Sequence, residues 1–289
     1  MIINTAGEYT LQYTATDACG NSTTVERDLV VDTPPRTVLY TDGTFIINEL
    51  GQDQATNTAL HGQPTNIYIP FDPNGATDAE KYIFVGGSNR PWSNERESIQ
   101  RVEIGSEIHP TSTERWFTGC THVTSFDLTN LYTENVTTMN SMFYNCKMLT
   151  SIDVSNFDTS NVTNMKDMFR YCIALTSLDL SSFNTSKVTT MEEMIDACSA
   201  LTSLDLSSFN TSLVTNMSSM IRNCSQLVTI YASSLFVVSQ VTSSIQMFFN
   251  SIAIVGGAGT AWNANNPTDK TYARIDNPPS APGYFTAKS

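Results

Sequence analysis

Residues 142–167 read MFYNCKMLTSIDVSNFDTSNVTNMKD, and the next 26 residues, 168–193, read MFRYCIALTSLDLSSFNTSKVTTMEE. A third copy, MIDACSALTSLDLSSFNTSLVTNMSS, occupies residues 194–219. A looser copy precedes these three at 116–141, and a decayed copy follows at 220–246. Residue type and spacing agree at many positions at once. A fixed period of this length predicts stacked supersecondary units.

The first half of each copy predicts a strand. Leu175, Leu178 and Leu180 form a Leu-x-x-Leu-x-Leu pattern. Alternation along a strand turns Leu178 and Leu180 inward and leaves Asp179 facing out. A polar turn follows, where Phe183 can fill the interior.

The second half of each copy predicts a short helix. In residues 188–198, apolar side chains recur at steps of three and four, which gives one apolar stripe. Thr189 and Glu192 have capping-box spacing, so we expect the helix to begin there. The equivalent N-cap candidates in other copies are Thr137, Thr163 and Thr215.

These patterns together predict an α/β solenoid, a leucine-rich-repeat stack with a parallel strand ladder and short helices. One strand and one short helix bury their apolar faces only by stacking on neighbours. Ile99, Val102 and Ile104 also fit the strand pattern, so we expect the stack to begin before the regular copies. The expected organisation is a β-hairpin at 1–33, a β-rich N-terminal cap at 34–95, the solenoid at 96–250 and a C-terminal cap at 251–289.

Short strands are expected ahead of the repeats. Residues 9–15 and 24–31 alternate like the two strands of a hairpin. Residues 37–40 and 44–50 flank an Asp-Gly turn, which favours a second hairpin. Shorter strand candidates lie at 67–70 and 82–85.

The composition restricts the function. The 289 residues contain 28 acidic and 15 basic side chains, which gives a net charge of −13. Nucleic-acid binding is therefore not expected, because it relies on Lys and Arg neutralising phosphates. No apolar stretch reaches the roughly 18 residues of a membrane helix, so no membrane insertion is expected. Only three His occur, and no catalytic motif surrounds them.

Cysteine recurs at the same interval as the repeat. We expect the five repeat cysteines to pack as buried free thiols, because unpaired Cys behaves as a small hydrophobe. Zinc requires ligands from converging directions rather than along a line. The repeat cysteines are Cys120, Cys146, Cys172, Cys198 and Cys224. Cys19 lies in the expected N-terminal hairpin turn, where we expect a free exposed thiol.

An outward-facing strand position is acidic in four successive copies. Neighbouring carboxylates about 5 Å apart repel by roughly 1 kcal/mol in water, so hydroxyls, a cation or a basic partner should offset this cost. Ca²⁺ suits carboxylate oxygens and stays an option, while no other cofactor, metal site or catalytic residue is expected. The candidate ligand-face residues are Asp127, Asp153, Asp179, Asp205, Ser151, Ser177, Ser203 and Tyr231.

The repeat pattern Cys-x-x-Leu-Thr-Ser-Leu-Asp-Leu-Ser-x-Phe-x-Thr-Ser-x-Val-Thr-x-Met-x-x-Met-Phe resembles the BspA-like leucine-rich repeats of bacterial surface proteins and phage proteins. The tail from Val255-Gly256-Gly257 to Gly283-Tyr284-Phe285 resembles that family's closing segment. Residues 7–31, GEYTLQYTATDACGNSTTVERDLVV, resemble the last strands of hyalin-repeat or immunoglobulin-like modules. The resemblance implies a binding or adhesion scaffold outside the cell and implies no reaction.

We therefore expect non-catalytic extracellular recognition, with the acidic strand face displayed to a host surface protein or glycan. Residues 1–4 lack signal-peptide features, so a chain complete from Met1 fits a phage virion protein (capsid decoration, fibre or tail). Residues 1–33 would then attach to a capsid or tail protein by strand addition. The alternatives are a fragment of a bacterial cell-surface adhesin and a polysaccharide-degrading enzyme, which needs paired carboxylates in a cleft. Homo-oligomerisation stays open.

Overall fold

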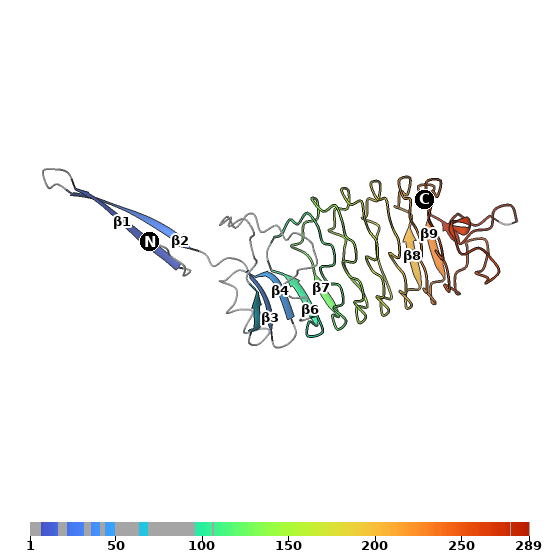
Figure 1. The fold of residues 1–289 in the computed structure, drawn as a ribbon, viewed down its shortest axis with the longest axis horizontal. Coiled ribbons are helices and arrows are strands. Elements are labelled where there is room, and N and C mark those ends of the chain that lie inside the picture. The colour runs from blue at the N-terminus through green and yellow to red at the C-terminus, as the bar shows by residue number, and fades with distance from the viewer. Residues whose placement is uncertain are drawn as a thin grey trace.

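The computed structural model describes residues 7–16, 22–31, 36–40, 44–49, 64–68, 96–105, 107–277 and 279–288. From residue 96 onward, the chain winds into successive coils that stack along one axis (Figure 1). Each regular coil corresponds to one 26-residue copy, because the residues joined between coils are separated by that interval, as in Thr138, Asn164 and Thr190. The expected solenoid of repeated units is confirmed.

One side of the stack, here called the strand face, carries a parallel ladder. Its strands are β6 (Arg101–Ile104), β7 (Ser125–Asp127), β8 (Ser203–Leu206), β9 (Thr229–Ala232) and β10 (Phe285–Ala287). β6 pairs with β7, and β9 pairs with both β8 and β10, all in parallel. In the coils between β7 and β8, the amide of Thr176 donates to the carbonyl of Thr150 at 3.0 Å. The predicted parallel ladder is therefore confirmed.

The opposite side of the stack, here called the turn face, corrects the helix prediction. Residues 188–198 form consecutive turns and contain no α-helix. Amides at Met191 and Glu193 donate to carbonyls of the next coil, each at 2.9 Å, whereas those at Met194 and Asp196 donate to carbonyls three residues back. Every second amide thus bonds a neighbouring coil, and the helical hydrogen-bond ladder cannot form.

Backbone geometry gives the second reason for the missing helices. In each coil two turn-face residues four positions apart have positive φ, for example Glu193 at 55° and Ala197 at 62°. A right-handed helix cannot pass through such residues. The predicted cap Thr189 instead donates its amide and its hydroxyl to the carbonyl of Thr163 in the preceding coil, at 2.8 and 3.1 Å.

The described residues contain one regular helical element, the short 3-10 helix η3 (Lys270–Tyr272). Within this part of the chain, no helix has the length and apolar character required to cross a membrane.

A continuous apolar core runs through the stack. Leu178 and Leu180 are buried, as their alternation predicts, and so are Ile99 and Val102 of the expected degenerate first coil. Ring stacking continues from coil to coil, with centroids 5.7 Å apart for Phe117–Phe143 and 5.5 Å apart for Phe143–Phe169. The repeat cysteines are buried thiols that form no disulfide within the described residues, as expected: Cys120, Cys146, Cys172, Cys198 and Cys224.

The N-terminal strands match two of the expected hairpins. β1 (Gly7–Thr16) pairs antiparallel with β2 (Ser22–Val31). β3 (Arg36–Tyr40) pairs antiparallel with β4 (Thr44–Glu49) and with β5 (Pro64–Tyr68). β4 also pairs in parallel with β6, so the second hairpin continues the ladder of the solenoid. The strand candidate at 82–85 and Cys19 lie outside the described residues, and the division into four regions stays a prediction.

The C-terminal segment packs against the last coil. The Phe248 ring lies 5.2 Å from the Tyr284 ring and 6.1 Å from the Phe285 ring, centroid to centroid. Asp276 accepts hydrogen bonds from the amides of Ala258 and Gly283, at 3.0 and 3.1 Å, and so ties two loops together. Residues 245–250, which include Phe248, form a turn.

Candidate ligand-binding face

The predicted acidic column exists on the strand face. Asp127, Asp153 and Asp179 are exposed, and the side chain of Asp205 is 28% exposed. Asp205 lies opposite Tyr231 in the register between β8 and β9. The structure therefore aligns the carboxylates as the repeat predicts. We call Asp127, Asp153, Asp179 and Asp205 the acidic column.

The column extends beyond the four expected carboxylates. Glu103 of β6 is the register partner of Asp127, and Thr286 of β10 is the partner of Tyr231. Glu103 was not among the predicted residues, although it stands between two apolar strand residues, as each column aspartate does. At the other end, the sequence gives no signal for Thr286, because β10 belongs to no repeat copy.

Local hydrogen bonds fix one oxygen of each column carboxylate. The Oδ1 atom accepts a hydrogen bond from the amide two residues further on, an arrangement that Asp favours in turns. The donors are Thr129 at 3.1 Å and Ser155, Ser181 and Ser207 at 2.9 Å each. In the described residues, Asp127, Asp153 and Asp179 form no ion pair. Three carboxylates are thus held in place without a charged partner in this part of the chain.

Hydrogen bonds of this kind also favour the ionised form of Asp153 and Asp179. Hydrogen bonds from the Ser155 hydroxyl and amide lower the pKa of Asp153. The Ser181 amide and hydroxyl do the same for the pKa of Asp179. Neighbouring hydroxyls were predicted to offset the repulsion between the carboxylates, and those of Ser155 and Ser181 do so. By contrast, Ser151, Ser177 and Ser203 are exposed, and among the described residues their hydroxyls bond no column carboxylate.

The chain itself supplies a basic partner at one end of the column. The Lys288 ammonium forms an ion pair with Asp205. It also lies 5.4 Å from the centroid of the Tyr231 ring, within the range of a cation–π interaction. Burial opposes ionisation of Asp205, but the bonds from Lys288 and Ser207 outweigh it and lower the pKa of that carboxyl. The negative charge of Asp205 is therefore compensated by a lysine of the same chain.

A concavity of about 570 Å³ opens between the first two column residues. Its lining combines an aromatic ring, two carboxylates and two hydroxyls. The lining residues are Phe126, Asp127, Leu128, Thr129, Asp153, Ser155 and Asn156. The Asn156 amide donates to the carbonyl of Leu128 at 2.9 Å, which holds the two coils together beneath the concavity. The cavity therefore presents mainly hydrogen-bond acceptors beside an apolar surface.

The described residues contain no group of three or more His, Cys, Asp or Glu side chains that could hold a metal ion.

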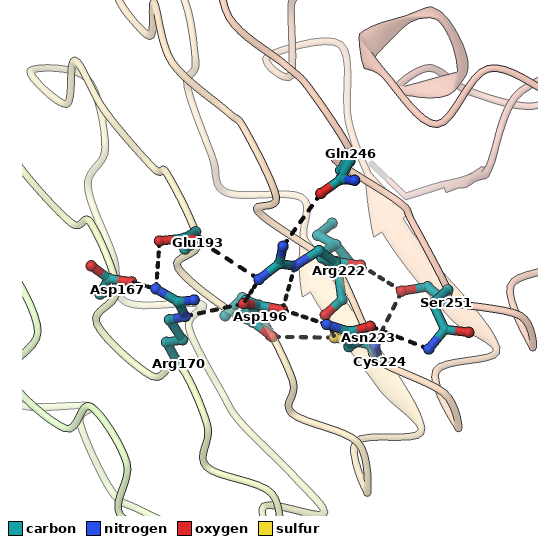
Figure 2. A network of polar contacts seen from close by, with 12 residues as sticks. Asp167, Arg170, Glu193, Asp196, Arg222, Asn223, Cys224, Gln246 and Ser251 are labelled. Carbon is teal, nitrogen blue, oxygen red and sulfur yellow. Dashed lines mark hydrogen bonds and ion pairs between the residues drawn. The ribbon is translucent and has the colours of Figure 1, made fainter. Parts of the chain in front are cut away.

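A second charged cluster lies on the turn face, and the sequence prediction missed it (Figure 2). Its residues are Asp167, Arg170, Glu193, Asp196 and Arg222, here called the turn-face cluster. Asp196 is fully buried and accepts from Arg170 at 3.1 Å and from Arg222 at 2.8 Å. Arg170 also bonds Glu193 at 2.6 Å and Asp167 at 3.1 Å. Because its charges pair with one another, this cluster serves the packing of the coils.

The repeat period contains a signal that could have revealed the turn-face cluster. At intervals of 26 residues, one position reads Tyr144, Arg170, Asp196 and Arg222. Stacking brings such a column together, so opposite charges in consecutive copies predict an ion pair between coils.

Comparison with known proteins places the chain in a family. Residues 111–233 and 179–274 both match the family described as "Mycoplasma protein of unknown function, DUF285". The two matches together span residues 111–274, more than half of the 289 residues. No curated protein and no solved structure matches the chain. The matched segments contain the regular coils of the solenoid, and the chain therefore belongs to the DUF285 family.

Proposed function

We propose that the protein is a non-catalytic recognition scaffold that acts outside the cell, with the strand face as its ligand-binding surface. The concavity between Asp127 and Asp153 is the observation that carries this proposal. It lies on an exposed face whose carboxylates are fixed by backbone amides. A solenoid face suits recognition because it aligns many identical side chains on a rigid support.

Polysaccharide hydrolysis is the less favoured alternative. A glycosidase general acid needs a carboxyl whose pKa is raised, so that it holds a proton near neutral pH. Hydrogen bonds lower the pKa of Asp153 instead, so this concavity residue is ionised. Asp153 therefore suits binding better than proton donation.

The location proposed is the surface of a phage virion, where the protein would display the strand face to host proteins or glycans. The β1–β2 hairpin would attach the chain to a capsid or tail protein by adding a strand at its open edge. The resemblance of the repeats to BspA-like surface proteins supports a place outside the cell. Mass spectrometry of purified virions and of cell envelopes tests this location, because the protein should be found in the virions. Deletion of residues 1–33 should then abolish its incorporation.

A bacterial cell-surface adhesin is the second candidate. The name of the DUF285 family refers to Mycoplasma proteins of unknown function, which favours a bacterial source over a phage source. In this case the protein should be found in the cell-envelope fraction and be absent from virions.

The binding role is tested with the purified chain and host cells. A triple variant Asp127→Asn, Asp153→Asn and Asp179→Asn removes three charges, while each amide oxygen can still accept the local backbone hydrogen bond. We expect at least a fivefold loss of cell binding for this variant. Asp158→Asn is the matched control, because Asp158 accepts a similar bond from the Ser160 amide at 2.9 Å but is not a column residue. Equal binding by the wild type and the triple variant would refute the proposed role of the strand face.

A further inference from the structure

We infer that the concavity between Asp127 and Asp153 binds lysine ammonium groups of a protein partner. This inference rests on the proposed function, since it names the chemistry that the strand face would recognise. Three features of the strand face point to this ligand: a lysine already bound on this face, a concavity with matching groups, and three column carboxylates without a cation.

The chain shows how this face holds an ammonium group. Lys288 forms its ion pair with Asp205 while its Nζ atom stands 5.4 Å from the Tyr231 ring centroid. Asp205 and Tyr231 occupy the column position in neighbouring strands. A carboxylate and an aromatic ring together are favourable for a cation, because one supplies charge and the other a negative ring face. The strand face therefore already binds a lysine side chain at one end.

The concavity offers the same combination at the other end of the column. Asp127 and Asp153 supply carboxylates, and the partly buried ring of Phe126 lies beside them. The position of that ring is fixed by contacts with Phe117 and Phe143, at centroid distances of 4.9 and 5.1 Å. The groups are thus held in place before a ligand arrives.

Three carboxylates of the acidic column differ from the acidic residues of the turn face in their charge pairing. Asp167, Glu193 and Asp196 are bonded by Arg170, and Glu192 pairs with Lys166 at 2.7 Å. In the described part of the chain, Asp127, Asp153 and Asp179 form no ion pair. A cationic partner would supply the charge that the turn face obtains from its own arginines.

The ligand must carry several lysines. A single exposed ammonium–carboxylate pair binds weakly and is screened by salt. Successive coils lie about 4.8 Å apart, so one extended segment with several lysines can reach consecutive carboxylates. Simultaneous contacts then raise the affinity through effective concentration.

Pentalysine is the probe, and the same peptide with Nε-acetylated side chains is its uncharged control. Nuclear magnetic resonance titration of the full chain should shift the amides of Thr129 and Ser155, which donate to the two carboxylates of the concavity. The double variant Asp127→Asn and Asp153→Asn should weaken binding at least fivefold. Asp158→Asn should change it less than twofold. The spectrum of each variant, recorded without peptide and compared with that of the wild type, verifies that the variant is folded.

Lys288→Met provides a test by gain of binding. Removal of this ammonium frees Asp205 and Tyr231, so pentalysine should then also shift the amide of Ser207, which donates to Asp205. The acetylated peptide should shift none of these amides in either protein.

The following outcomes would overturn the inference. Equal affinity of the double variant and the wild type would show attraction by the overall negative charge alone. Equal binding of the acetylated peptide would exclude ammonium recognition. Binding of an oligomer of glucosamine without binding of pentalysine would assign the site to an amino-sugar glycan. If the triple variant loses host-cell binding while pentalysine fails to bind, the proposed function stands and the lysine assignment alone fails.

Discussion

At the scale of single residues, Asp196 makes the most connections in the turn-face cluster. Its fully buried carboxylate bonds two guanidinium groups and the Asn223 amide. Asp196→Ala would leave Arg170 and Arg222 without their shared partner, so we expect a loss of about 3 kcal/mol in the free energy of unfolding. Urea denaturation measures this change. Glu192→Gln is the control, because its partly exposed pair with Lys166 should contribute less than about 1 kcal/mol.

Ala197 lies in the left-handed region with φ of 62°. A non-glycine residue there costs roughly 1 kcal/mol, so Ala197→Gly should stabilise the protein by up to about that amount. Ala174 has no positive φ, and Ala174→Gly should destabilise the protein by about 0.5 to 1 kcal/mol. Thermal unfolding of both variants measures the two effects. Destabilisation of similar size at both positions would contradict the turn geometry.

At the scale of structural elements, the turn face shows where sequence patterns mislead. Val188, Met191, Met194 and Cys198 are all buried, as the predicted apolar stripe requires. The same spacing, however, also fits a path of tight turns in which alternate amides bond the next coil. Local periodicity cannot distinguish these two paths, because the deciding hydrogen bonds join residues 25 positions apart, such as Met191 and Asn216.

The C-terminal cap depends on an ionised Asp276. Burial opposes its ionisation, but hydrogen bonds from Thr260, Gly283 and Ala258 outweigh it and lower the pKa of this carboxyl. Because the folded-state pKa lies below the unfolded value of about 3.9, the stabilisation is full above that pH and is lost as pH falls through the folded-state value. Asp276→Asn should therefore destabilise the protein at pH 7 and make less difference in strong acid. Unfolding by urea across this pH range provides the measurement, and an equal effect at every pH would contradict the role of the charge.

Close packing of the cap loops explains why residue 256 is a glycine. A Cβ atom at that position would lie 2.2 Å from the carbonyl oxygen of Gly283 and 2.6 Å from Oδ2 of Asp276. Only a residue without a side chain allows the two loops to approach this closely.

At the scale of the whole molecule, the repeat alone predicts the stack, the parallel ladder and the outward acidic column. Asp179 and its equivalents follow from alternation and period, without any knowledge of distant contacts. The concavity beside Phe126 could not be predicted, because it depends on how two unequal copies fit together. The Lys288–Asp205 pair could not be predicted either, since it joins residues 83 positions apart in the chain.

All coils of the stack share one apolar interior, and thiol labelling can test this feature of the fold. Cys120, Cys146, Cys172, Cys198 and Cys224 are each fully buried, and burial raises the pKa of the Cys172 thiol to about 12. In a Cys19→Ser background, a thiol reagent followed by mass spectrometry should therefore label none of these five cysteines in native buffer. In denaturant it should label all of them. Rapid native labelling of Cys172, in the middle of the stack, would contradict a single continuous core.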